Sequence, residues 1–262
     1  MFCLVVSPEG NWKMSVRPLF LMLLIFLPVH FTLLPVQGEV NSKAEAGKSS
    51  LEFQGKGQVI IPKLRYDGDH PITLEAWAKP EARDDNYIRA SVVANLQLAG
   101  VGIHYSGGHW MVHFNEGRKS NAGYASVVSD AEAEHDKPVH LAAVFDGKNV
   151  LLFVNGKKQE SVNETTLKHV ASPHDFMIGA DPNGTGLPHQ FFKGAIDEVR
   201  ISKVARYSED FEPAHRFKPD KDTLVLYHFD EGTGNVAHDE SGNQYDGKIK
   251  NAAWVKQIIP EP

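Results

Sequence analysis

Carboxylates are concentrated in the segment YHFDEGTGNVAHDESGNQYDGKI, from Tyr227 to Ile249. Paired carboxylates can do acid/base chemistry, carboxylates among carbonyl oxygens can hold calcium, and clusters of Asp, Asn and Gly can reverse the chain. The DESGNQYDG part matches turn residues better than a catalytic pair and lacks the spacing of an EF-hand. Turns are therefore the first expectation, and ligation of a cation by Asp239 is the second.

A second carboxylate pattern, SDAEAEHDKP, places Glu132 and Glu134 two residues apart. Retaining glycosidases need two carboxyl groups about 5–5.5 Å apart, and residues i and i+2 of a strand share one face. However, this segment has no apolar alternation and ends in Pro138. It is predicted to be a solvated loop, which argues against glycoside hydrolysis.

Histidines form a third pattern, because GVGIHYSGGHWMVHFNEG contains His104, His109 and His113. Along one strand, His109 and His113 would be about 13 Å apart, too far to share a zinc ion. We expect exposed histidines on a polar sheet face, and a cross-strand pair of His104 with His109 is the alternative. His140, inside an apolar hairpin, is expected to be a hydrogen-bonded core residue.

The elements that must position these residues are short strands. In ITLEAWAKP and PVHLAAVFDG, alternate residues fall on opposite faces of a strand, and both faces carry apolar residues. This pattern is typical of strands inside stacked sheets. Hairpin turns are predicted at Ser106-Gly107-Gly108, Asp146-Gly147 and Asn155-Gly156. A helical turn or two is expected only in KVARYSEDFEP. Trp77 and Trp254 are assigned to the core. The fold class is all-β, with two packed antiparallel sheets.

The N-terminal segment reads as a secretory signal covering residues 1–38, with Met14 as a plausible true start and VQG as the cleavage pattern. Pro28, His30 and Pro35 interrupt its apolar run, so no stable membrane span is expected after cleavage. Residues 39–50 are predicted to be a flexible leader. The single cysteine, Cys3, falls in the signal, so no disulfide is expected. The net charge of −6 disfavours a nucleic-acid partner.

Several phrases in combination resemble a known family. They are ITLEAWAKP, KPVHLAAVFDGKNVLLFVNGKK, FMIGADPNG, FKGAIDEVRISKVARYSEDF and the closing LVLYHFDEGTGNVAHDESGNQYDGKI. Together they are similar to the laminin-G-like jelly roll of the concanavalin A-like lectin/glucanase superfamily, over about Leu51 to Val255. Pro138 stands where the family usually has Trp, Asn155-Gly156 replaces Asp-Gly, and the FDEGTG phrase closes the domain rather than opening it.

The resemblance implies a two-sheet jelly-roll sandwich over residues 51–258 and a structural calcium. The superfamily commonly holds this ion near a sandwich edge through an Asp that matches Asp197, and an amide-capping role is the alternative. The expected function is a secreted or periplasmic, noncatalytic module that binds glycan or an extracellular protein at a sheet face or loop rim. A divergent glycoside hydrolase or polysaccharide lyase is the alternative. Candidate ligand-binding aromatics, chosen because sugars stack on aromatic rings, are Tyr87, Tyr105, Trp110 and Tyr124.

Overall fold

The computed structural model describes residues 48–82, 89–117, 124–164 and 170–259, all of which fall within the unit Asn41–Pro262. The predicted signal segment and residues 39–47 of the predicted leader lie outside the described residues. The first strand begins at Ser49, so the last two residues of the expected leader belong to the sheet. No helix that could span a membrane is found in the described ranges.

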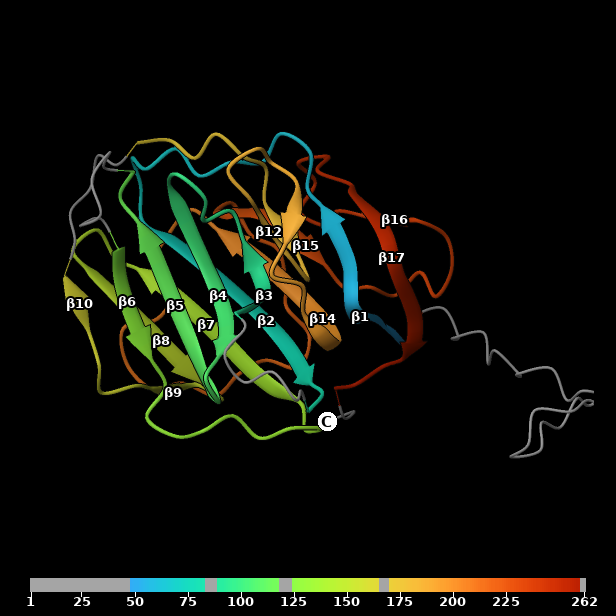
Figure 1. Cartoon of the computed structure of the whole chain (residues 1–262), viewed down its shortest axis with the longest axis horizontal. Coiled ribbons are helices and arrows are strands. Elements are labelled where there is room, and N and C mark those ends of the chain that lie inside the picture. Colours follow the sequence, from blue (N-terminus) through green and yellow to red (C-terminus); the bar gives the residue numbers. More distant parts are fainter. Residues whose placement is uncertain (1–47, 83–88, 118–123, 165–169, 260–262) are drawn as a thin grey trace, which may run out of the picture. The chain divides into compact units, whose positions relative to one another are not determined.

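The described residues form strands and no helix, which confirms the all-β prediction (Figure 1). The strands are β1 (Ser49–Ile60), β2 (Ile72–Pro80), β3 (Ala90–Ala94), β4 (Gly100–Ser106), β5 (His109–Asn115), β6 (Tyr124–Val128), β7 (Val139–Phe145), β8 (Asn149–Val154), β9 (Lys157–Lys158), β10 (Asn163–Glu164), β11 (Met177–Ile178), β12 (Asp181–Pro182), β13 (Pro188–His189), β14 (Lys193–Ser202), β15 (Thr223–Tyr227), β16 (Val236–Ala237) and β17 (Gly247–Lys256).

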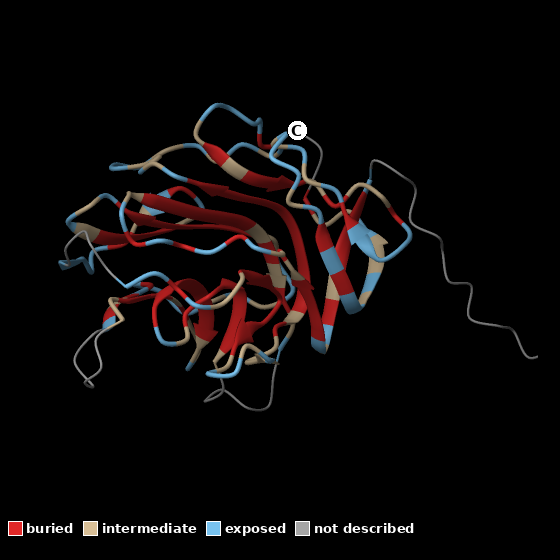
Figure 2. Ribbon diagram, turned by 90° about the horizontal axis from the view of Figure 1, so that it is seen from above, coloured by how far each residue is buried: buried red, intermediate tan, exposed pale blue. Residues whose placement is uncertain are grey.

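One large antiparallel sheet curls into two facing layers, as Figure 2 shows. Its strand order is β10-β8-β7-β2-β14-β1-β11-β3-β4-β5-β6, with β15 beside β14 and β17 beside β1, while β12 and β13 form a separate pair. Apolar residues from both layers meet in one core cluster that includes Phe53, Leu74, Ile103, Val112 and Leu141. Burial of this apolar surface is the main favourable term that holds the layers together.

The predicted hairpin turns are confirmed. β4 and β5 meet at Gly107-Gly108, β7 and β8 at Asp146-Gly147, and β8 and β9 at Asn155-Gly156. Gly156 has a φ of 72°, and a Cβ at this position would lie 1.9 Å from the carbonyl oxygen of Phe211. Only glycine fits this turn, because the strap that follows β14 passes directly over it.

The strap, residues 203–222, covers the second face of β7 and β8 and explains why those strands are apolar on both sides. Tyr207 and Phe211 stack on each other and pack against a second buried cluster that contains Ala142, Val144 and Phe153. The expected helical turn in KVARYSEDFEP is wrong. The backbone of this segment makes hydrogen bonds to the sheet, through Thr73 of β2, and no hydrogen bonds of a helix.

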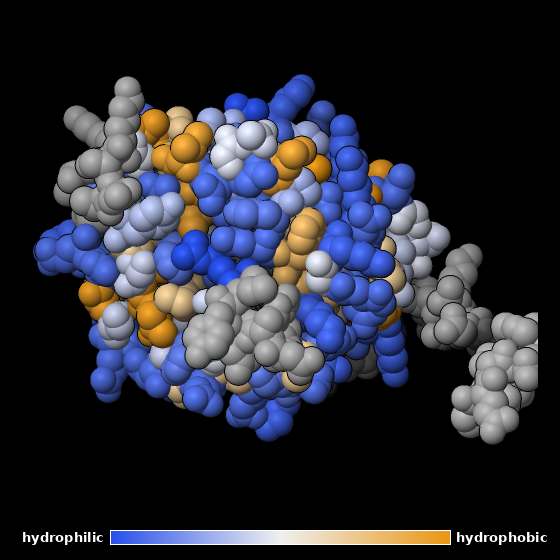
Figure 3. All heavy atoms as spheres, viewed as in Figure 1, coloured by the Kyte–Doolittle hydropathy of each residue, from blue (hydrophilic) through white to orange (hydrophobic). Residues whose placement is uncertain are grey.

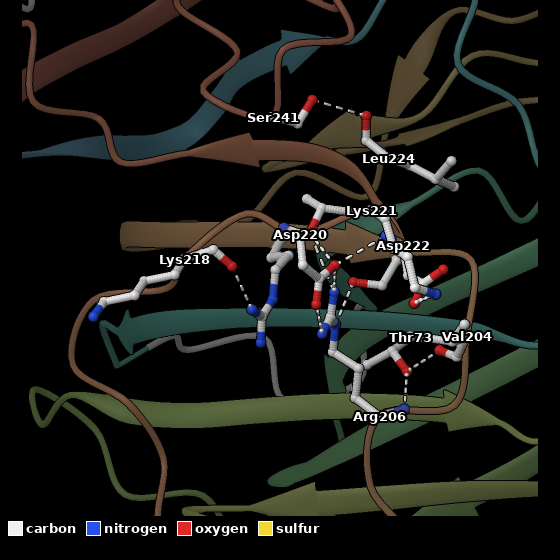
Figure 4. Close-up of polar contacts among 12 residues, drawn as sticks. Thr73, Val204, Arg206, Lys218, Asp220, Lys221, Asp222, Leu224 and Ser241 are labelled. Atoms are coloured by element: carbon white, nitrogen blue, oxygen red, sulfur yellow. Dashed lines mark hydrogen bonds and ion pairs between the residues drawn. The ribbon is translucent and has the colours of Figure 1, made fainter.

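Figure 4 shows how the strap is fastened. The guanidinium of Arg206 binds both carboxylate oxygens of Asp220 at 2.8 and 2.9 Å. The backbone N–H of Arg206 donates to Thr73 Oγ1, and this hydroxyl donates to the carbonyl oxygen of Val204. The Arg200 guanidinium donates to the carbonyl oxygen of Lys218 at 3.0 Å. The strap is thus tied both to itself and to β2 and β14.

Beneath the strap lies a buried charge network centred on Glu75, whose side chain is inaccessible to solvent. Arg200 Nε donates to Glu75 at 2.7 Å, and the Tyr207 hydroxyl donates at 2.8 Å. His140 is buried as predicted, but the expected hydrogen bond of its ring is not formed: neither ring nitrogen has a hydrogen-bond partner among the described residues, and Nε2 lies 3.5 Å from the same carboxylate. Burial alone would raise the pKa of Glu75, but His140 and Arg200 hold it below its ordinary value. Removing one partner of this network would leave a buried charge without its counter-charge, and none of the three described pockets is lined by Glu75 or Arg200.

Candidate functional site

The four candidate aromatics have different environments. Tyr87 lies outside the described residues. Tyr105 and Trp110 are only 3% and 2% exposed, and their rings pack edge to face at 5.6 Å within the core. Neither offers a free ring face to a sugar in this structure. Tyr124, on β6, is 50% exposed and offers such a face.

Tyr124 belongs to the outer face, the side of β3–β6 that points away from the core. Strand alternation defines this face, because Val112 and Phe114 of β5 point into the core while Met111 and His113 point outward. Its members are Ser91, Gly102, His104, Met111, His113, Tyr124, Ser126 and Val128. β4 and β5 lie in front in Figure 1, and Figure 3 shows that this side of the molecule is mostly hydrophilic.

His104 lies at the centre of the outer face. Its ring covers Gly102, where a Cβ would lie 2.6 Å from His104 Nε2, and its Nδ1 is 2.9 Å from the hydroxyl of Ser91. Nε2 is buried and has no hydrogen-bond partner in the described part of the chain. Burial, followed by the charges of His113 and Arg89, lowers the pKa of His104 well below its ordinary value. The imidazole is therefore neutral.

His113 lies beside it, with ring centroids 5.2 Å apart, and the ring of Tyr124 lies 6.3 Å from that of His113. Arg89 Nη2 is 3.2 Å from His113 Nε2. Burial, and then the Arg89 charge, lowers the pKa of His113 to about 4. Arg89, His113 and Tyr124 thus form a row from a cation, through a neutral imidazole, to an exposed ring.

The expectation of exposed histidines is wrong for His104 and His113, which are buried. The alternative pairing is also wrong, because His104 lies opposite Met111, and His109 lies opposite Ser106. The burial of these histidines comes from tertiary contacts. Residues that follow β11 approach the β3 edge, where the N–H of Ser91 donates to the carbonyl oxygen of Gln190 at 2.8 Å.

Two further groups are electrostatically coupled to the cluster formed by Arg89, His104 and His113: His189 of β13 acts on His104, and Arg89 acts on Asp181 of β12. Asp181 Oδ1 accepts the N–H of Leu96 at 2.9 Å, and Oδ2 is buried without a hydrogen-bond partner from any described residue. Burial raises the pKa of Asp181 to about 6. His189 Nδ1 contacts the carbonyl oxygen of Asp181 at 2.8 Å. The cluster thus combines one cation, one carboxylate of raised pKa and three imidazoles.

A separate pocket of about 420 Å³ lies at the loop rim, lined by Trp110, Asp130, Glu132, Glu134 and Gln159 among others. The SDAEAEHDKP segment is a loop, as predicted, and Glu134 is paired with Lys137. Both oxygens of Asp130 accept the N–H of Glu160. These carboxylates do not form a strand-borne catalytic pair.

Asp197, the candidate calcium ligand, is fully buried where β14 changes partner from β1 to β15. The Ser50 hydroxyl donates to Oδ2 at 2.7 Å, and the N–H of Glu198 donates to Oδ1 at 2.9 Å. Burial, together with the charges of Glu198 and Asp230, raises the pKa of Asp197 to about 8. A carboxylate in such surroundings favours a proton or a cation as its partner.

Asp239 does the turn chemistry that the opening segment predicts. Its carboxylate accepts the N–H groups of Leu226, Ser241 and Tyr245 at 2.9–3.1 Å. In the described part of the chain, no three His, Cys, Asp or Glu side chains gather closely enough to hold a metal ion. A cation at Asp197 would therefore rely on one carboxylate with hydroxyl and carbonyl oxygens, a donor set that suits calcium better than zinc.

Sequence reasoning missed Arg89, Ser91 and Asp181 as members of the cluster. One signal was readable, because Gly102 stands two residues before His104 on the same face and leaves room for its ring. The approach of Asp181 was not readable from spacing, since it comes from a segment far along the chain.

Solved structures that are similar to this chain include the following three. A Bacteroides ovatus protein to which carbohydrate binding has been ascribed superposes with a TM-score of 0.62 and 16% identity, over 82% of this chain and 61% of its own. The LG4-5 domains of the mouse laminin α1 chain give a TM-score of 0.47 at 14% identity, over 66% of this chain and 48% of the laminin chain. The CBM40 domain of a Ruminococcus gnavus IT-sialidase gives a TM-score of 0.48 at 13% identity, over 62% of this chain and 93% of the CBM40 chain.

This chain thus spans less than two thirds of the Bacteroides and laminin chains that it matches. No curated protein matches it. The family model described as the concanavalin A-like lectin/glucanases superfamily matches residues 53–210, more than half of the chain, from within β1 to the strap. The chain therefore belongs to the Laminin_G_3 family of that superfamily.

Proposed function

We propose that this protein is a noncatalytic module that binds a saccharide on its outer face. The observation that carries the proposal is the half-exposed ring of Tyr124 next to His113 and Arg89. Saccharide sites combine an aromatic ring, which stacks on the apolar face of a sugar, with a few polar groups that fix its orientation. Both components are present on adjacent strands here.

The neighbours of Tyr124 extend this surface. Val128 is exposed, Met111 and Ser126 are partly exposed, and all three lie on the same side of β5 and β6. A rigid sheet holds these side chains in fixed positions, so little conformational entropy is lost when a ligand binds. The Bacteroides ovatus protein, with the same fold, supports a saccharide as the class of ligand.

Two further features belong to this proposal. The protein is secreted after cleavage at the predicted site following Gly38, and a structural calcium is held at Asp197. The buried Asp197 carboxylate, with Glu198 and Asp230 nearby, supports the calcium site. The apolar run before VQG supports secretion. The intact mass of protein recovered from culture medium tests cleavage, since a mass that retains Arg17 would contradict it.

Binding to a panel of immobilised polysaccharides tests the central proposal. We expect the wild-type protein to bind at least one glycan, and Tyr124→Ala to weaken binding by several-fold to about tenfold, the range of one ring contact. Val236→Ala removes an exposed apolar side chain from β16 and should leave binding unchanged. Retention of full affinity by Tyr124→Ala, or binding to an extracellular protein and no glycan, would contradict the proposal.

A further inference from the structure

Arg89 is a partly buried cation with no anionic partner among the residues that the structure describes. Across residues 48–82, 89–117, 124–164 and 170–259, no carboxylate lies within ion-pair distance of it, and the hydrogen bond of its side chain goes to His113 Nε2 at 3.2 Å. Removing a guanidinium from water without an opposite charge costs free energy. The planar fork of arginine donors matches a carboxylate or sulfate particularly well.

His113 presents a second unused donor. A guanidinium can only donate hydrogen bonds, so Nε2 of the neutral His113 ring must be the acceptor and Nδ1 must carry the proton. Nδ1 is buried, in a side chain that is 5% exposed, and no described residue forms a hydrogen bond with it. A buried N–H without an acceptor is costly unless a ligand or water supplies one.

His104 presents a third. Its Nδ1 is hydrogen-bonded to the Ser91 hydroxyl, and Nε2 is buried above Gly102 with no partner within the described ranges. When the Ser91 hydroxyl donates to Nδ1, the proton of the neutral ring is on Nε2. His104 and His113 are adjacent, with ring centroids 5.2 Å apart, and the charge of Arg89 contributes to lowering the pKa of both rings.

We propose that the outer face selects saccharides that carry an acidic group, a carboxylate or a sulfate ester, and that the Arg89 guanidinium, positioned by its hydrogen bond to His113 and the neighbouring His104 ring, holds this group. The inference rests on the proposed function, since Tyr124 would stack on the sugar that carries the acid. The net charge of −6 repels polyanions in general, so such binding requires a specific site.

The charged groups that face this site set its pH dependence. They are Arg89, Asp181 from β12 and His189 from β13, besides the two imidazoles. Asp181 opposes an anion when it is ionised, and its pKa is about 6. Acidic saccharides should therefore bind more tightly at pH 5.5 than at pH 7.5, because Asp181 is protonated while a uronic acid of ordinary pKa remains ionised.

Four ligands separate the sources of the anion. Polygalacturonate and its methyl ester differ in a free carboxylate, and dextran sulfate and dextran differ in a sulfate ester. We expect the wild-type protein to bind at least one acidic polymer at least about tenfold more tightly than its neutral counterpart, the value of one charge-assisted hydrogen bond. Arg89→Gln should abolish this preference, and Arg89→Lys should restore part of it.

Arg65→Gln is the matched control, because Arg65 is already paired with Asp175 at 2.7 Å. This substitution should leave the preference for acidic polymers unchanged. Gly102→Ala is the second variant, since the added Cβ would displace the His104 ring. This displacement should reduce the preference for acidic polymers. Thermal melting of each variant verifies folding. Equal binding of acidic and neutral polymers, unchanged by Arg89→Gln, would overturn this inference and leave saccharide binding intact. Failure of the wild-type protein to bind any glycan would overturn the proposed function itself.

Discussion

Nη2 of Arg89 lies 3.2 Å from Nε2 of His113, so a permanent cation is held directly against an imidazole. The imidazole must stay neutral, because protonation would bury a second positive charge beside the first. This contact couples the electrostatics of the outer face to the stability of the fold.

The first prediction concerns acid stability. The pKa of His113 falls from its ordinary value of 6.5 to about 4 in the folded protein, so the folded state binds fewer protons than the unfolded state in this interval. The stability that the neutral His113 contributes is fully present above about pH 6.5 and is lost as the pH drops towards 4, a loss of about 3 kcal/mol. Urea unfolding at several pH values measures the decline.

His113→Gln removes this titration and should flatten part of the decline, while His104 continues to contribute. His238→Gln is the control, since His238 is 61% exposed and should not change the profile. The raised pKa values of Asp181 and Asp197 affect both proteins alike, so the comparison isolates His113: the same change in stability between pH 4.5 and pH 7.5 in His113→Gln and in the wild-type protein would show that this imidazole is not buried as described.

The second prediction concerns Glu75. Glu75→Gln leaves Arg200 buried without its counter-charge, and we expect a loss of about 3–5 kcal/mol in the free energy of unfolding. Glu134→Gln breaks an exposed pair with Lys137 and should cause no measurable change. If both variants unfold at the same urea concentration, the network does not fasten the strap.

The third prediction concerns calcium. Excess calcium should stabilise the wild-type protein by about 2.7 kcal/mol at 100 times Kd, a rise of several degrees in Tm. Asp197→Asn should abolish most of this rise. Asp239→Asn should lower the baseline Tm, because it weakens the closing turn, but should keep the calcium response. Identical melting curves in calcium and in chelator would exclude the metal site.

The fourth prediction concerns catalysis. Glu132 and Glu134 lie on an exposed loop, and we expect no hydrolysis of any glycan that the protein binds. Reducing-sugar assays over long incubation measure this. Turnover that disappears in Glu132→Gln or Glu134→Gln would show that the loop-rim pocket is an active site.

The fold could be predicted in large part because its signals are local. Asp146-Gly147 and Asn155-Gly156 specify their hairpins, and alternation along β7 specifies two buried faces. That the second face lies under the strap could not be predicted, because Tyr207 and Phe211 reach it from a distant segment.

The candidate site was less predictable for the same reason. Tyr124 could be proposed from its residue type alone. The burial of His104 and His113 depends on residues around Asp181 and Gln190, whose contacts are set by the tertiary fold and not by spacing. Trp110 shows the converse, since an aromatic suited to a sugar fills the core instead.

The most direct test of the central claim is a two-dimensional NMR titration with the tightest-binding glycan from the panel. We predict that resonances of Arg89, His113 and Tyr124 shift, while those of the loop around Glu132 do not. Tyr124→Ala should reduce the shifts at His113. Shifts confined to the loop-rim pocket, around Asp130 and Gln159, would contradict the account and move the site to the other end of β5.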